Sequence, residues 1–278
     1  STHSDGLMSA KAVIKTYADL GYDFTCLSDH LWIDENYAAK SVYDGRNLDR
    51  KDFITLPSAE LHCYGKKYDQ DGVWHIVANG LPTDFACPDA NESAADLIAR
   101  AQAGGAYVSL AHPGWYNMTT SEALLVSAAD AVEIYNYSCV LSSARESGIM
   151  IADFLLNEGH KISFTATDDS HFHLPDFAGG WVMVAAPELS QGAIIAALKA
   201  GHHYSSTGAD FNDISIDKGI LTVQTTPVQS IVLSGEGHLA SACHGNNITV
   251  AKFELSEFAS QWFRITARGF SNQMAWSN

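Results

Sequence analysis

Residues 144–171, ARESGIMIADFLLNEGHKISFTATDDSH, contain the pattern that decides the fold class. A helical apolar period ends at Gly159, and a short apolar run then leads to Asp169-Ser170-His171. The same unit of helix followed by strand recurs over residues 9–30, 93–114 and 121–136, and a further cycle covers residues 179–208. Strands that alternate with helices predict an α/β domain with a parallel sheet, open or closed into a barrel.

The pattern changes near residue 209. Short apolar runs now follow one another at close spacing, with turn residues between them and no helical period. They are residues 213–217, 220–226, 229–235, 247–255 and 262–269. We therefore predict a barrel domain over residues 1–208 and a small antiparallel β-sandwich domain over residues 209–278.

Composition narrows the choice of partners. The 278 residues carry a formal charge of −16, which repels nucleic-acid backbones and anionic membranes. No run of about 18 apolar residues is present, so we expect no membrane span. The five cysteines form no Cys-x-x-Cys pair, which argues against a disulfide framework or a thiolate zinc site and mildly favours the cytoplasm. Neither the compartment nor the oligomeric state can be read further.

Ionisable side chains gather where the apolar runs end. Twelve histidines are present, and several lie beside Asp or Glu. The strand-end groups are Asp29 with His30, Glu60 with His62, His112, Glu133 with Asn136, and Asp169 with His171. In a parallel barrel these ends open onto one face, so the sequence predicts an active site there.

Two spacings point to metal binding. Asp169 and His171 are two residues apart, as are Glu60 and His62, so on a strand each pair faces the same way. Oxygen and imidazole donors without thiolate suit zinc, manganese or iron, and this many groups can hold more than one ion. His75 competes with His62 for one ligand position, and the residues alone leave that choice open.

Other charged residues carry less weight. We expect His3 not to be a ligand, and His173 to lie near the pocket at most. We predict surface or turn positions for His160, His202, His203, His238 and His244, and solvated positions for Arg46, Arg50, Lys51, Lys66, Lys67 and Arg145. Neither a Gly-x-Ser-x-Gly elbow nor a phosphate-binding P-loop is present.

Six ordered motifs resemble the polymerase and histidinol phosphatase (PHP) family of metal-dependent hydrolases. They are SDG (4–6), LSDH (27–30), SAELH (58–62), LAHPGW (110–115), VEIYN (132–136) and TATDDSH (165–171). The likeness is greater to the branch of carbamate-hydrolase-like proteins with a C-terminal β domain. The resemblance implies a distorted (β/α)7 barrel with two or three divalent ions at its rim.

The resemblance also assigns residues. It implies metal ligands at Asp5, His30, Glu60, His75, His112, Asp169 and His171, with Glu60 as a bridging ligand. His171 or His75 would transfer protons, and Glu133 would line the catalytic pocket beside Asn136. One feature departs from the family, which begins with a His-x-His strand. The two histidines would lie immediately before residue 1, so we expect the first strand to be missing from this sequence.

Three functions are compatible with these motifs and spacings. Hydrolysis of a small phosphate ester by a metal-activated water is the family's commonest reaction and our first expectation. Hydrolysis of a carboxylic ester, carbamate or amide at the same site is the alternative. A non-catalytic binding module that retains the fold is the third reading.

Overall fold

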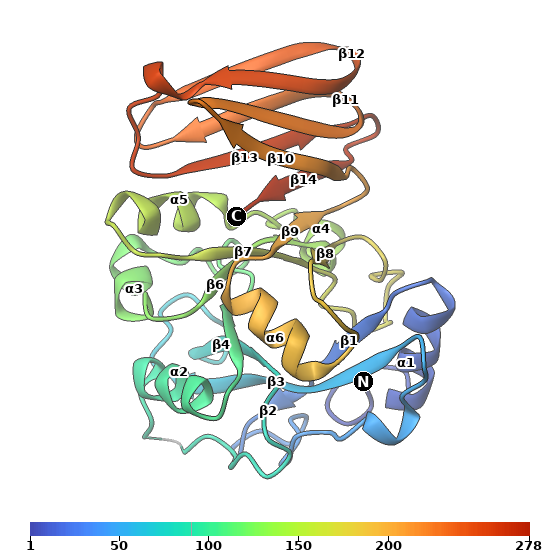
Figure 1. Ribbon diagram of the computed structural model, residues 1–278. Helices are drawn as coiled ribbons and strands as arrows, with labels where there is room; N and C mark the ends of the chain where they lie inside the picture. Colours follow the sequence, from blue (N-terminus) through green and yellow to red (C-terminus); the bar gives the residue numbers. More distant parts are fainter. Residues whose placement is uncertain (90) are drawn as a thin grey trace.

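A computed structural model describes residues 1–89 and 91–278. The fold is mixed α/β with two curled sheets, which Figure 1 shows at opposite ends of the molecule. The first sheet consists of β1 (Phe24–Leu27), β2 (His30–Leu31), β3 (Ile54–Tyr64), β4 (Val73–Asn79), β5 (Tyr107–Leu110), β6 (Ala131–Asn136) and β7 (Ser163–Thr167). Its order is β1-β3-β4-β5-β6-β7, and β2 pairs with β3 beyond β1.

Most of this sheet is parallel, but β4 runs the other way. β1 and β2 pair parallel with β3, and β5, β6 and β7 pair parallel with one another. β4 is antiparallel to both β3 and β5. Only residues 65–72 separate β3 from β4, and a tight turn in which the Gly65 N–H donates to the Gly72 carbonyl reverses the chain there. A parallel connection needs a longer crossover, so the expected regular β/α alternation fails at this point.

Helices cover the sheet, and all but the one over residues 137–142 lie where the sequence predicts them. They are α1 (Ala10–Asp19), α2 (Ala94–Ala103), α3 (Thr120–Leu125), α4 (Tyr137–Ser142), α5 (Ile149–Asn157) and α6 (Gln191–Lys199), with short 3-10 turns at Arg46–Leu48 and Leu255–Glu257. The Ser9 and Ser93 hydroxyls cap α1 and α2 by accepting from backbone N–H groups of the first turn. The core between sheet and helices includes Leu61, Ile76, Leu97, Ile98, Leu110 and Val132.

The second sheet is antiparallel and includes strands from both predicted domains. Its members are β8 (Trp181–Val184), β9 (His203–Ser206), β10 (Phe211–Asp217), β11 (Ile220–Gly235), β12 (Ala240–Glu254), β13 (Phe263–Arg268) and β14 (Met274–Ser277). The order is β10-β11-β13-β14-β9-β8, and β12 pairs with β11. Residues 181–184, expected to continue the parallel sheet, and residues 203–206, for which the sequence indicated a turn, instead join this one, because β14 supplies the partner of β9.

A bend in β11 replaces the expected sandwich of two sheets. The first part of β11 pairs with β10, and its last part pairs with β13, with register shifts between Gln224, Val228 and Ser230. The sheet therefore curls on itself as one hydrogen-bonded unit around Leu221, Val223, Ile231, Leu233 and Phe253. Arg264 on β13 forms an ion pair with Asp153 on α5, which attaches this sheet to the rest of the molecule.

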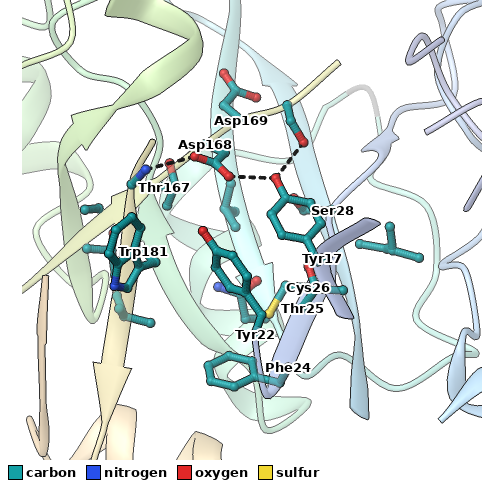
Figure 2. A pocket seen from close by; sticks show the side chains of 18 of the residues that line it. Tyr17, Tyr22, Phe24, Thr25, Cys26, Ser28, Thr167, Asp168, Asp169 and Trp181 are labelled. Carbon is teal, nitrogen blue, oxygen red and sulfur yellow. Dashed lines mark hydrogen bonds between the residues drawn. The ribbon is translucent and has the colours of Figure 1, made fainter. Parts of the chain in front are cut away.

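β1 and β7 each have one unpaired edge in the part of the chain that the structure describes. β1 bonds to β3 alone, and β7 bonds to β6 alone. A cavity of about 770 Å³, which we call the β1–β7 slot, is lined by both strands and by β8. Ile194 and Leu198 of α6 line it as well, and Figure 2 shows it from close by. In the described residues, no helix is long and apolar enough to cross a bilayer.

Candidate metal centre

Most of the expected ligands meet at one rim of the first sheet, beside the β1–β7 slot. Two groups of three side chains have donor atoms within 4.8 Å of one another: Asp5, His30 and His171, and Glu60, His75 and His112. They come from the loop before α1, from β2, β3 and β4, and from the loops after β5 and β7. The structure therefore brings together six of the seven predicted ligands.

Glu60 lies at the centre, in contact with three imidazoles. One carboxylate oxygen is 2.7 Å from His75 Nδ1 and 3.2 Å from His112 Nε2, and the other is 3.0 Å from His30 Nδ1. The residue is only 4% exposed. Burial alone would raise the pKa of Glu60, but the charges of His30 and His75 and the hydrogen bonds outweigh it and hold the pKa well below its usual value. A permanently ionised carboxylate at this position suits a bridging ligand.

The other nitrogen of His75 faces a carboxylate that the sequence analysis missed. Asp69 Oδ1 is 3.4 Å from His75 Nε2, and Asp69 Oδ2 accepts from the N–H groups of Asp71 and Val73. Burial opposes protonation of His75, but the Glu60 charge and the contacts with Asp69 and Glu60 raise its pKa to about 9. Asp69 lies in the turn between β3 and β4, where carboxylates are ordinary, so no sequence signal distinguished it.

The Asp5 group is more open. Asp5 Oδ2 is 3.5 Å from His30 Nε2 and 3.6 Å from His171 Nε2. Burial opposes ionisation of Asp5, but the hydrogen bond and charge of His30 and the charge of His171 lower its pKa to about 2. His171 Nδ1 contacts the Asp169 carbonyl at 2.8 Å, so its Nε2 is left facing Asp5.

Asp169 and Glu133 lie beside these groups without belonging to either among the described residues. Asp169 accepts from Asn136 Nδ2 at 3.1 Å. Glu133 accepts from the His112 N–H at 2.7 Å, from Thr167 Oγ1 at 2.9 Å and from Asn136 Nδ2 at 3.2 Å. These contacts place Glu133 under the His112 loop, where it orients the ligand. A ligand role for Asp169 and a catalytic role for Glu133 stay predictions.

The backbone at two of these residues is unusual. His112 and Asp169 have φ angles of 27° and 54°, in the region that favours glycine. Such conformations cost free energy, persist only where the surrounding contacts hold them, and occur often at functional sites. Here the contacts of Glu133 and Asn136 supply that support.

The donor set fits divalent metal ions. Both groups combine imidazole nitrogen with carboxylate oxygen, a mixture that zinc, manganese and iron accept. His112 also leaves its buried Nδ1 atom without a partner while its Nε2 faces Glu60. Within the described residues, no cysteine joins these groups.

The structure separates the two histidines that competed at this rim. His75 belongs to the Glu60 group, whereas His62 is fully buried beneath it, with Nε2 only 2.7 Å from His30 Nδ1. His30, Glu60 and His62 form a third set of donors in proximity.

Two expectations for residues outside the centre were wrong. His203 is buried rather than on the surface, because β9 lies in the second sheet. The His203 ring contacts the Phe164 carbonyl. Lys66 is buried too, paired with Glu122 at 3.0 Å and placed over the Tyr116 ring. Neither residue joins the metal centre.

Comparison with known proteins supports the fold. No family model and no curated protein matches this sequence. Among solved structures, a two-domain protein of Bacteroides vulgatus that contains a predicted PHP-like metal-dependent phosphoesterase aligns with a TM-score of 0.55 and 16% identity, over 91% of this chain and 82% of that one. A Bifidobacterium adolescentis protein assigned as a metal-dependent phosphoesterase aligns at a TM-score of 0.41 and 12% identity, over 62% of this chain and 85% of that one. The first likeness supports a shared fold, since mixed α/β structure with two curled sheets is consistent with a two-domain PHP-like protein.

Proposed function

We propose that this protein is a PHP-like metal-dependent hydrolase that cleaves small phosphate esters. The observation that carries the proposal is the pair of donor groups, Asp5 with His30 and His171 and Glu60 with His75 and His112, at the mouth of one cavity. The shared fold with a PHP-like protein agrees with it. The assignment to a carbamate-hydrolase-like branch rests on the sequence motifs alone.

The two donor groups would hold divalent ions, which supply Lewis-acid polarisation of the ester and lower the pKa of a coordinated water. The chain's own residues have separable tasks. Glu60, in contact with rings from both groups, would hold them at a fixed separation. The His171 side chain is 29% exposed, the most open of the histidines in the two groups, and would be the ligand most accessible to a substrate. Asp69 would keep the His75 ring oriented.

A carbon ester, carbamate or amide is the second candidate substrate, and one observation favours it. Among the described residues that line the β1–β7 slot and the rim, none is Lys or Arg. Enzymes that bind a phosphate group ordinarily supply cationic side chains to it. Arg145, beside Trp115 in a smaller hollow of about 370 Å³, is a cation close to the rim.

The experiment is a metal analysis followed by three parallel assays. Purified protein is stripped with chelator, reloaded with manganese or zinc, and given p-nitrophenyl phosphate, p-nitrophenyl acetate or an aryl carbamate. Turnover of the phosphate that requires the reloaded metal and disappears in His112→Ala supports the proposal. Turnover of the carbon esters alone replaces it by the second candidate. Metal uptake without turnover of any substrate indicates a binding module.

We further propose that one more parallel strand, between β1 and β7, closes the first sheet into the expected barrel. The support is the β1–β7 slot, where two unpaired strand edges face a common cavity. An inserted strand would pair with backbone groups of β1 and with those of β7 beyond Phe164, whose N–H and carbonyl already bond to Asn278 and Ser205. A strand carrying His-x-His would direct both imidazoles to one side, toward Asp5 and Glu60.

A synthetic ten-residue strand with His-x-His tests this arrangement. Protection of β1 and β7 amides from hydrogen exchange and a higher metal content would support it, and a peptide with both histidines replaced by Ala should protect the amides without adding metal. Unchanged exchange with either peptide would contradict the proposal. The division of the chain into residues 1–208 and 209–278 also stays a proposal, since β9 hydrogen-bonds to β14 across that boundary.

A further inference from the structure

His62 is a buried histidine whose two ring nitrogens both have protein partners. Its side chain extends from β3 and is completely inaccessible to solvent. Nδ1 is 2.9 Å from the Trp74 carbonyl oxygen on β4, and Nε2 is 2.7 Å from His30 Nδ1 on β2. The ring therefore connects the backbone of one strand with a residue of the Asp5 group.

These contacts determine where the hydrogens lie. A carbonyl oxygen can only accept, so His62 Nδ1 must carry a hydrogen. The Glu60 carboxylate oxygen 3.0 Å from His30 Nδ1 can also only accept, so His30 Nδ1 carries a hydrogen as well. Across the 2.7 Å contact between the two rings, His30 Nδ1 is then the donor and His62 Nε2 the acceptor.

The hydrogen on His30 Nδ1 determines the state of the other ring nitrogen, Nε2. With its hydrogen on Nδ1, a neutral His30 presents an unprotonated Nε2. That nitrogen is the atom that faces Asp5, at 3.5 Å, in the group that also contains His171. An imidazole can ligate a metal only through an unprotonated nitrogen, so this tautomer is the one that the Asp5 group needs.

We propose that His62 is a positioning residue that fixes the tautomer and orientation of His30 for metal binding, and is not itself a ligand. This role rests on the proposed metal centre. The 2.7 Å separation between the two rings leaves no space for an ion between them, because a metal–nitrogen bond is itself about 2.0–2.1 Å long. Loss of such an outer hydrogen bond ordinarily lowers metal affinity about 10–100-fold.

Two variants separate hydrogen bonding from packing. His62→Leu fills the space without an acceptor, whereas His62→Gln can place an amide oxygen near the position of Nε2. His202→Leu, at an exposed histidine far from the rim in sequence, is the matched control. Circular dichroism and thermal melts establish that each variant is folded. Competition with a chromophoric chelator then measures zinc affinity and the number of ions, and ¹⁵N NMR of the metal-free protein, at a pH high enough to make His30 neutral, reports the tautomer of each histidine.

We expect wild-type His62 and His30 both to carry their hydrogen on Nδ1. His62→Leu should weaken the Asp5 group for zinc by about 10–100-fold with an unchanged number of ions, and should let His30 populate both tautomers. His62→Gln should restore most of the affinity, and His202→Leu should match wild type.

Several results would overturn the role. A His62 hydrogen on Nε2, an unchanged zinc affinity in His62→Leu, or equal weakening in the Leu and Gln variants would each refute it. Loss of an entire ion in His62→Leu would make His62 a ligand instead, and a wild type that takes up no zinc would refute the centre and this role together. Failure of phosphate-ester turnover with the tautomers and affinities as expected would reject the proposed function and leave the role of His62 intact.

Discussion

Replacing Glu60 by Gln removes the negative charge that three imidazoles share and keeps the side-chain volume. In the metal-free protein, His75 has a pKa of about 9 compared with its ordinary 6.5. Burial opposes this rise, so the Glu60 charge and the contacts with Asp69 and Glu60 must cause it. A histidine whose pKa is higher in the folded state stabilises that state fully below pH 6.5, and the stabilisation is lost as the pH rises through about 9.

The size of the effect follows from the difference between the pKa of His75 in the folded protein and its ordinary pKa. At about 1.4 kcal/mol per pH unit, this difference corresponds to about 3 kcal/mol of unfolding free energy lost between pH 6.5 and 9.5 in the metal-free wild type. His30, whose pKa burial would lower but Glu60 and Asp5 raise, contributes in the same direction. Without the Glu60 charge, we expect Glu60→Gln to lose less than about 1 kcal/mol over the same range.

Urea denaturation at several pH values, in excess chelator, measures the unfolding free energy of the wild type and of Glu60→Gln. A second series is recorded with saturating zinc. The stabilisation by zinc, taken as the difference between the two series, should increase with pH, because His75 must be deprotonated to bind a metal and uptake releases protons. Equal pH dependence in wild type and Glu60→Gln would refute the reasoning. A metal-free wild type whose stability stays constant from pH 6.5 to 9.5 would refute it as well.

Three further predictions concern other contacts. Asp153→Ala should lower the unfolding free energy by about 2 kcal/mol, because it leaves the buried Arg264 guanidinium without its carboxylate. Tyr17→Phe should cost about 2 kcal/mol, because it removes the 2.7 Å hydrogen bond to the buried Asp168 carboxylate, drawn in Figure 2. Both are measured by urea denaturation. His112→Ala should remove one ion per chain by elemental analysis of zinc-loaded protein and leave the Asp5 group filled.

Each of these has a matched control. Asp19→Ala breaks an exposed pair with Lys15 and should change stability by less than about 0.5 kcal/mol. Tyr68→Phe, at an exposed tyrosine, should likewise leave the unfolding free energy nearly unchanged. His202→Ala, at an exposed histidine, should keep the full ion content. A test variant that behaves like its control would contradict the corresponding contact or metal assignment.

Much of the rim could be predicted because its signals are local. Most of the expected ligands follow apolar runs, and the period of two along a strand brings Glu60 and His62 of β3 to the same set of donors. Asp169 and His171 lie instead in the loop after β7, so that period does not apply to them. The helix caps at Ser9 and Ser93 are local as well, since a hydroxyl satisfies an N–H group within its own first turn. Such features depend on residues that are neighbours in the chain, and short-range pattern is enough to find them.

The remaining features depend on partners far away in the chain. β9 pairs with β14, some 70 residues later, so no local pattern could assign it to the second sheet. The reversal at β4 brings Asp69 to His75 and places the Trp74 carbonyl over His62. Composition and spacing identified the side chains able to bind metal. The three-dimensional packing determined which of them face one another and which are buried as supports, because hydrogen bonds and burial depend on the whole fold.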